Sequence, residues 1–162
     1  MIVTQVCELK DLLEKEKIEI PQEVLKKNDL VIVPSKRNTE RPYVDVSIVP
    51  TLKEMKRDIP KTEIYPAENL EYKDFRSADF QTPLFIILED YVRPIVLALI
   101  ARWIGNIISE HLARKKADPE NKLLKEPAVR VRFYQDKAKK YFEIEGNATA
   151  VQEIEKDLLK QD

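Results

Sequence analysis

The stretch RPIVLALIARWIG, residues 93–105, stands out because seven consecutive apolar residues, 95–101, interrupt a chain in which 35% of the residues are charged. A transmembrane helix needs about 20 mostly apolar residues. Here Arg102 closes the apolar run, and Glu89 and Asp90 precede it. A charged side chain near the bilayer centre is unfavourable by about 2.5 to 3.5 kcal/mol on insertion scales. The sequence therefore predicts no membrane span.

The same stretch predicts a helix with a wide apolar face. At about 100° per residue its apolar side chains share roughly half of the helix circumference. Small residues, Ala98, Gly105 and Ser109, flank this face, which is typical of a helix that is covered on two sides. Either the core of the chain covers it, or it also supports self-association; contact with a membrane surface is a third interpretation. The residues at its centre are Ile100, Trp103, Ile104, Ile107 and Ile108.

The region before this helix contains short elements of both kinds. Helical spacing of apolar residues predicts short helices over residues 5–16 and 21–28. β-branched, alternating sequences predict strands in DLVIVP, residues 29–34, and in YVDVSIVP, residues 43–50. Four prolines between residues 50 and 83 predict a linker or a packed arm, with no more than a turn or two of helix.

The segment directly before the apolar helix has two interpretations. LFIIL, residues 84–88, fits a buried strand or the beginning of a helix, because periodicity cannot separate the two over so short a run. In the helical interpretation Thr82 is the N-cap and Pro83 is the first helical residue. Pro94 then kinks this helix or begins a new one.

The last part of the chain has the pattern of a hairpin followed by a helix. AVRVRFY, residues 128–134, and KYFEIE, residues 140–145, alternate apolar and polar side chains and are joined by a short polar connection. Gly146 ends the hairpin, and Thr149 with Gln152 fits a capping box at the start of a last helix.

Together these elements predict an α+β fold, in which one or two small antiparallel sheets pack on a long central apolar helix and a C-terminal hairpin and helix follow. We divide the chain near residue 80. Residues 1–80 hold helices, strands and the proline-rich arm, and residues 81–162 hold the long helix, the hairpin and the last helix. The alternative is one continuous domain.

The composition excludes several classes of site. Two glycines cannot build a P-loop or a dinucleotide-binding loop, which need several glycines close to phosphate. One histidine, His111, and one cysteine, Cys7, exclude a zinc site of the usual Cys/His type within one chain. We therefore expect no catalytic residues, no cofactor and no metal. The lone cysteine, and first twenty residues without a signal-peptide pattern, predict a cytoplasmic protein.

A basic window covers residues 111–140, with ten lysines and arginines against four acidic residues. Within it Arg130, Arg132 and Tyr134 are alternate residues and project from one side of the predicted strand. Two guanidinium groups beside an aromatic ring could bind a phosphate and a base, so these three are candidate phosphate-binding residues. The alternative is a solvated strand face after a lysine-rich helix end, where positive charge complements the helix dipole.

The order of parts from residue 84 to residue 160 is an apolar helix, a basic exit, the hairpin VRVRFY…KYFEIEG and a capped helix. This order resembles the small effector-associated constant-component modules of bacterial conflict systems. The resemblance implies a non-enzymatic adaptor that couples sensor and effector proteins. We therefore expect an interaction or adaptor protein that binds another protein or a second copy, with self-association through the central helix. A nucleic-acid-binding protein that uses residues 111–140 is the alternative.

Overall fold

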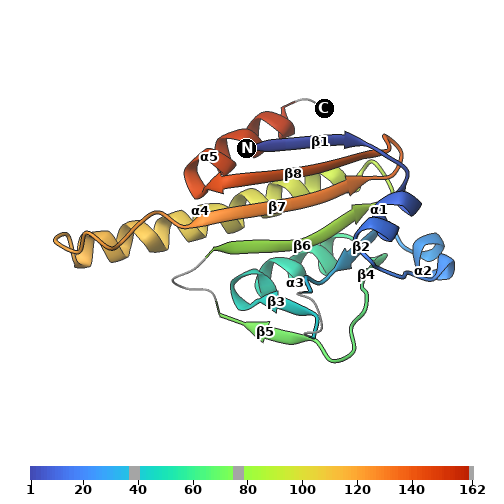
Figure 1. The fold of residues 1–162 in the computed structure, drawn as a ribbon, viewed down its shortest axis with the longest axis horizontal. Helices are drawn as coiled ribbons and strands as arrows, with labels where there is room; N and C mark the ends of the chain where they lie inside the picture. The colour runs from blue at the N-terminus through green and yellow to red at the C-terminus, as the bar shows by residue number, and fades with distance from the viewer. Residues whose placement is uncertain (37–40, 75–78, 161–162) are drawn as a thin grey trace.

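The structure is a computed structural model that describes residues 1–36, 41–74 and 79–160. Within these ranges a six-stranded sheet runs through the molecule in the order β1-β8-β7-β6-β2-β4 (Figure 1). Its strands are β1 (Ile2–Val6), β2 (Leu30–Val33), β4 (Thr62–Ile64), β6 (Phe80–Ile87), β7 (Ala128–Gln135) and β8 (Lys140–Asn147). Two further strands, β3 (Tyr43–Asp45) and β5 (Glu71–Lys73), form a separate parallel pair.

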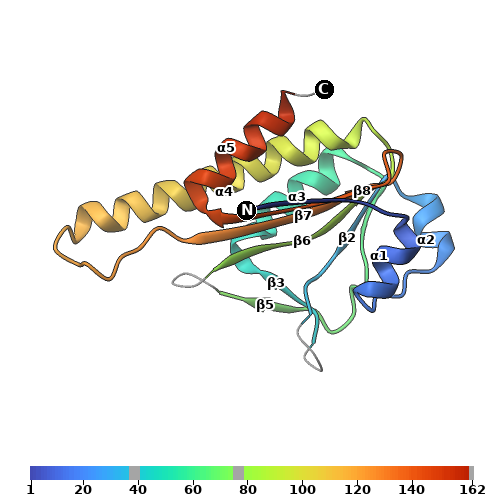
Figure 2. The same ribbon diagram turned by 45° about the horizontal axis from the view of Figure 1, so that its top comes forward.

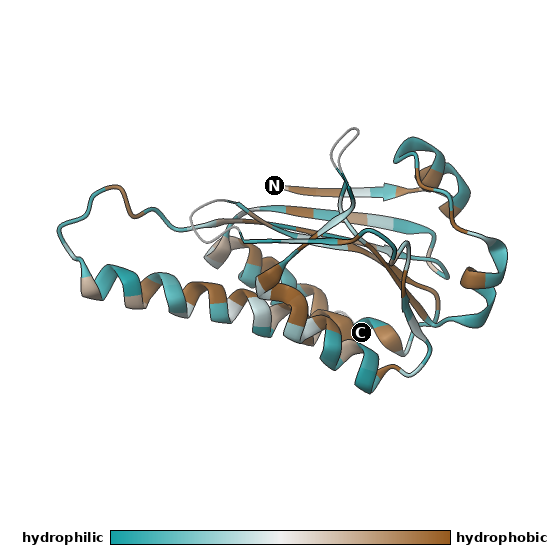
Figure 3. Ribbon diagram, turned by 90° about the horizontal axis from the view of Figure 1, so that it is seen from below, coloured by the Kyte–Doolittle hydropathy of each residue, from teal (hydrophilic) through white to brown (hydrophobic). Residues whose placement is uncertain are grey.

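Helices cover the two faces of the sheet unequally (Figure 2). One face is covered by α3 (Val49–Asp58), which follows the 3₁₀ helix η1 (Val46–Ile48), by α4 (Val92–Ala117) and by α5 (Ala148–Leu159). Figure 3 shows these helices together on one side of the sheet. The short helices α1 (Leu9–Lys15) and α2 (Gln22–Lys27) lie on the opposite face, at one end only. Among the described residues, no helix covers the rest of that second face.

Each helical layer has its own apolar core. The main core lies between the sheet and α3, α4 and α5, and it includes Phe133 of β7, whose ring stacks on that of Phe142 at a centroid distance of 4.7 Å. A second core lies under α1 and α2 and joins Leu12 and Leu13 to Tyr134 of β7 and Tyr141 of β8. Successive residues of a strand point to opposite faces, so β7 contributes to both cores.

The predicted α+β fold is confirmed, with a long central helix, a C-terminal hairpin and a last helix in the expected order. The sheet is mixed, because β6 pairs in parallel with β7 and β2 pairs in parallel with β4. The first pairing is parallel because α4 is a helical crossover that returns the chain to the end of the sheet at which β6 began. Strands from residues 1–80 and from residues 81–162 share this sheet.

Residues 84–87 of this segment lie in a strand, β6, which ends one residue before Leu88, and the alternative of a helix that begins at Thr82 and Pro83 is wrong. Both residues lie inside β6, where the register with β7 shifts between Gln81 and Leu84. Proline is tolerated at such an irregularity because no ladder hydrogen bond is needed from its nitrogen. Thr82 Oγ1 accepts a hydrogen bond of 3.2 Å from the Arg132 N–H instead of capping a helix. Helix α4 begins at Val92 and runs without a break to Ala117, with Pro94 in its first turn.

Residues 43–50 form a strand only as far as Asp45, so the predicted long strand is wrong beyond that point. Asp45 is buried and its carboxylate accepts a hydrogen bond of 2.9 Å from the Ser47 N–H, which caps η1. Residues 50–83 are not a linker, because they contain most of α3, two short strands and the beginning of β6. Pro50 lies in the first turn of α3, where its missing N–H has no partner to lose.

Two helix boundaries also differ from the predictions. The chain begins with a strand, β1, which includes residues 5 and 6 of the predicted helix. The helix predicted for residues 5–16 therefore spans only Leu9–Lys15. The N-cap of α5 is Asn147, whose side chain accepts a hydrogen bond of 2.9 Å from the Ala150 N–H. The predicted capping box is therefore wrong, because Thr149 instead donates its N–H to the Glu126 carboxylate at 2.7 Å.

Candidate functional site

The chain itself covers the apolar face of α4. Ile100, Trp103, Ile104 and Ile107 are buried in the main core, and Ile108 is half-buried against it. Trp103 donates its indole N–H to Ser47 Oγ at 2.9 Å, and its ring and that of Phe80 are nearly perpendicular, with centroids 6.3 Å apart. These side chains hold α4 on the sheet, so this face needs no second copy to cover it.

Among the described residues, α4 is the one helix that is long and apolar enough to cross a membrane by length and composition. Half of its most apolar window is buried inside the structure. The core helix of a soluble protein meets the same two criteria. The finding is compatible with the expectation of no membrane span.

The fold divides the basic window between two ends of the molecule (Figure 1). The end of α4 and the loop after it carry Arg114, Lys115, Lys116, Lys122 and Lys125 at one end. The β7–β8 turn and the first residue of β8 carry Lys137, Lys139 and Lys140 at the other. Carboxylates lie beside several of these groups. Glu110 contacts Arg114 at 2.8 Å, Glu89 contacts Lys137 at 3.4 Å, and Glu8 contacts Lys139 at 2.6 Å. The window is therefore not one continuous basic surface.

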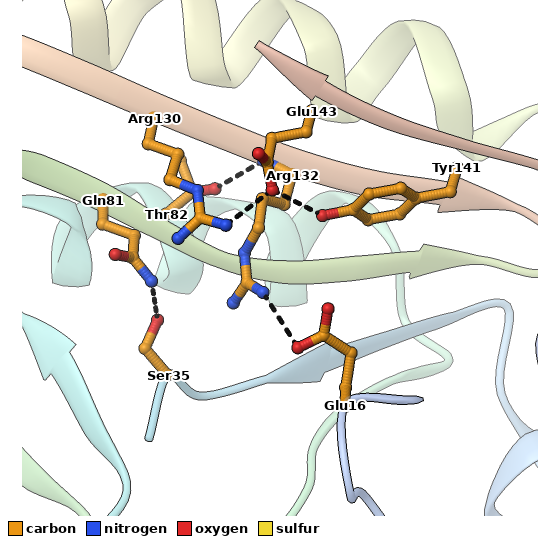
Figure 4. Close-up of polar contacts among 8 residues, drawn as sticks. All are labelled: Glu16, Ser35, Gln81, Thr82, Arg130, Arg132, Tyr141 and Glu143. Atoms are coloured by element: carbon orange, nitrogen blue, oxygen red, sulfur yellow. Dashed lines mark hydrogen bonds and ion pairs between the residues drawn. The ribbon is translucent and has the colours of Figure 1, made fainter. Parts of the chain in front are cut away.

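The predicted phosphate-binding arginines lie in a polar cluster on the sheet face opposite α4 (Figure 4). The cluster consists of Glu16, Ser35, Gln81, Thr82, Arg130, Arg132, Tyr141 and Glu143. Arg130 contacts the Glu143 carboxylate at 2.6 Å, and the Tyr141 hydroxyl donates to the same carboxylate oxygen at 2.8 Å. Arg132 lies 3.7 Å from the carboxylate of Glu16, which follows α1. Two arginines and two glutamates leave the cluster without net charge.

The pKa values in the cluster follow from these contacts. Burial acts to raise the pKa of Glu143, but the hydrogen bonds from Arg130 and Tyr141 and the arginine charges outweigh burial and lower that pKa. Burial raises the pKa of Tyr141, and its hydrogen bond to Glu143 raises it further. At neutral pH the cluster therefore contains an ionised carboxylate and a neutral phenol.

Arg130, Arg132 and Tyr134 do share one face of β7, as the alternation predicts. None of the three side chains is freely available to a ligand, for two different reasons. Tyr134 is fully buried, and its hydroxyl donates to the backbone carbonyl of Cys7 at 2.7 Å; burial raises its pKa to about 12. Within the described part of the chain, the Nε atoms of both arginines are buried and have no hydrogen-bond partner. The guanidinium groups face carboxylates, and the ring of Tyr134 has no exposed face on which a base could stack.

The lone histidine lies outside this cluster. His111 is buried on α4 and lines a pocket of about 370 Å³ together with Phe80, Ile107 and Leu124. Across residues 1–36, 41–74 and 79–160, no group of three or more His, Cys, Asp or Glu side chains is arranged to hold a metal ion.

The sequence prediction missed an exposed strand at the edge of the sheet, β1. All five of its residues, Ile2–Val6, are exposed, including Ile2 at 53% and Val6 at 73%. None of them is charged. The signal was present, because four of the five residues are β-branched. The helical pattern of residues 5–16 overlapped this strand and concealed it.

The hydrogen bonds to β8 show which backbone groups of β1 face outward. Glu145 donates its N–H to the Met1 carbonyl at 2.9 Å, and Cys7 donates its N–H to the Lys139 carbonyl at 3.0 Å. In an antiparallel ladder every second residue exchanges such bonds, so odd-numbered residues of β1 bond to β8. The N–H and C=O groups of Ile2, Thr4 and Val6 therefore point away from the sheet, where no described strand pairs with them.

Comparisons of this chain with models of protein families, with curated proteins and with solved structures found no match. A proposal for its function therefore depends on the surfaces and side chains described above.

Proposed function

We propose that this chain is a non-enzymatic interaction or adaptor module, and that it binds an extended segment of another polypeptide along the open edge of its sheet. The observation that carries the proposal is β1, an edge strand whose five residues are all exposed and uncharged. An open edge presents unpaired N–H and C=O groups that act as a template for a further strand. Addition of such a strand is a recurring mode of peptide recognition.

The polar cluster supports binding in preference to acid–base catalysis. A general acid or base works best when its pKa lies near the operating pH. The pKa of Glu143 is instead lowered by Arg130 and Tyr141 after the opposing effect of burial, and that of Tyr141 is raised by burial. Neither group changes its charge near neutral pH. The paired charges of the cluster are better suited to holding β6, β7 and β8 in register.

An adaptor needs a second surface, and we assign it to the arm formed by residues 112–127. This arm contains the last turns of α4 and the loop that returns to β7, and it projects beyond the sheet (Figure 1). Leu112 is 58% exposed and Leu123 is 88% exposed, and Lys115 and Lys116 lie between them in sequence. The coupling role follows the resemblance to constant-component modules of bacterial conflict systems, and a cytoplasmic location forms part of the same proposal.

The nucleic-acid-binding alternative has less support. The basic groups of residues 111–140 lie at two ends of the molecule, and carboxylates contact Arg130 and Arg132 between them. Binding of a phosphate to either arginine would have to displace an existing ion pair. The buried ring of Tyr134 cannot stack on a base without rearrangement of the second core.

The test is selection of peptides from a random displayed library against the wild type and against Thr4→Pro. Proline removes one outward N–H but no bond to β8, so the strand itself should persist. We expect the wild type to enrich extended, alternating apolar peptides that Thr4→Pro fails to bind. Thr4→Val, which keeps the N–H, is the matched control and should bind them as the wild type does. Peptides that bind wild type and Thr4→Pro equally, or no enrichment by a wild type that is monomeric, would contradict the proposal.

A further inference from the structure

We infer that the strand that pairs with this edge is β1 of a second copy, which runs antiparallel to the first about a twofold axis at Thr4. This inference rests on the proposed use of the edge for binding. It moves self-association from the central helix, which the chain already covers, to the first strand. The twofold makes the interface isologous, with the same residues on both sides.

The outward backbone groups of β1 are arranged symmetrically about Thr4. They belong to Ile2, Thr4 and Val6, as the bonds from Glu145 to Met1 and from Cys7 to Lys139 require. In an antiparallel pairing centred on Thr4, Thr4 lies opposite Thr4 of the second copy and Ile2 lies opposite Val6. Each of these pairs can exchange two hydrogen bonds. Every outward N–H and C=O of the strand then has a partner.

The side chains fit the same register. Residues that lie opposite each other in a ladder project from the same face, so exposed Ile2 would cover exposed Val6 of the second copy on the face toward the helices. Ile2 already lies beside Ile144 of β8, and the pairing would extend this apolar row across the twofold axis. On the other face Val3 would lie beside Gln5. A shift of one residue would place inward-facing amides opposite outward-facing ones and leave the ladder unpaired.

Charge also favours a second copy. Two identical strands repel each other when like charges lie opposite, and natural edges commonly carry lysine for this reason. Residues 2–6 contain no charged side chain. Glu8 lies just beyond the strand, and the ammonium group of Lys139 neutralises it at 2.6 Å. The edge thus lacks the charge that would keep two copies apart.

The position of the axis can be tested by charge exchange at Thr4. Thr4→Lys and Thr4→Glu each place like charges about 5.5 Å apart across the axis, measured between Cα atoms. We expect the wild type to show a concentration-dependent dimer in sedimentation velocity, and each variant alone to dimerise at least about tenfold more weakly. An equimolar mixture of the two variants should restore the dimer. Unchanged melting temperatures, measured at a concentration at which the wild type is monomeric, would show that each variant is folded.

Gln5→Lys and Gln5→Glu provide the matched control on the same strand. Gln5 lies opposite Val3 of the second copy, so mixing these two variants should not restore any dimer beyond what each forms alone. A wild type that stays monomeric at high concentration, or a dimer that persists in Thr4→Lys, would overturn the inference. If the wild type is monomeric but the library yields peptides that depend on the Thr4 N–H, the second copy is excluded and the proposed function stands. If neither is found, both are wrong.

Discussion

The two edges of the sheet differ in every property that controls strand addition. β4 has three residues, is half-buried, and lies between Pro60 and Pro66, which cannot donate backbone hydrogen bonds. Its central residue, Glu63, contacts Lys27 at 3.3 Å and accepts a hydrogen bond from the Asn28 amide at 3.3 Å. β1 has five residues, all exposed, without proline or charge. Short length, proline and charge are the usual protections of an edge, so β4 is protected and β1 is open to a partner.

The largest effect is expected for Ile104→Asp, because both edges depend on the packing of α4 against the sheet. Ile104 is fully buried in the main core. A carboxylate there should lower the free energy of unfolding by about 3 to 5 kcal/mol and remove any binding at β1. Urea denaturation measures the change. Leu112→Asp, on the exposed end of the same helix, is the control and should change stability by less than about 0.5 kcal/mol. Equal stability of Ile104→Asp and wild type would show that the face is not packed.

The next largest effect concerns Glu155 on α5, which packs on β8, the strand that holds β1. Glu155 is fully buried, and within the described chain its carboxylate has no hydrogen-bond partner. Burial raises its pKa to about 8, although the charge of Lys156 acts to lower it. The folded state then keeps a proton that the unfolded state releases, so stability should fall as the pH rises from about 4.5 to about 8.

Glu155→Gln should remove this pH dependence and stabilise the protein above pH 8 by several kcal/mol, on the order of 2 to 4. Denaturant unfolding at a series of pH values from 5 to 9 measures it. Glu153→Gln, an exposed position on the same helix, is the control and should follow the wild type. A wild type whose stability does not decline between pH 5 and pH 8 would show that Glu155 is ionised in the fold.

A smaller effect is expected for Glu143→Gln, in the polar cluster beside the open edge. The variant leaves Arg130 without its carboxylate partner and should reduce stability by about 1 to 2 kcal/mol at pH 7. Since the pKa of Glu143 is lowered by Arg130 and Tyr141 against the effect of burial, this contribution is present above its usual pKa and is lost as the pH falls through the lowered value. Wild type and variant should therefore converge in acid. Glu145→Gln, an exposed neighbour on β8, is the control, and a pH-independent difference would contradict the assignment.

The smallest effect is expected for Glu63→Ala, which removes the charge from the protected edge. The ion pair with Lys27 lies near the surface, so its loss should reduce stability by less than about 1 kcal/mol. Because Pro60 and Pro66 still flank β4, no new association should appear in sedimentation. A dimer formed by Glu63→Ala through β4 would mean that a single charge, and not the combination of length and proline, protects this edge.

Local sequence was enough to predict α4, the β7–β8 hairpin and α5, because each has a periodic apolar pattern over many residues. It was not enough for β6. Thr82 and Pro83 have the chemistry of a helix start, and only pairing with β2 on one side and β7 on the other shows that they lie in a strand. The prediction of a strand over residues 43–50 was wrong after Asp45 for a similar reason. The role of Asp45 as the cap of η1 depends on where the chain turns, which the local pattern does not show.

In the candidate site, too, local sequence predicted some features, while others depend on contacts between distant parts of the chain. Alternation alone predicted that Arg130 and Arg132 share a face of their strand. Their partners could not be predicted, because Glu143 and Glu16 come from another strand and from the residue after α1. The burial of Tyr134 depends on helices more than 100 residues away in the chain.

The sequence by itself determined the elements with long local periodicity, the apolar face of α4 and the absence of glycine-rich phosphate loops, since these depend on residues that are close in the chain. The tertiary structure alone decided which strands are neighbours. β1 pairs with β8, about 140 residues later, and this pairing makes it an edge strand and directs the backbone groups of Ile2, Thr4 and Val6 outward. Strand pairing is a contact between distant segments whose partner is set by the whole fold, so a local pattern cannot encode it.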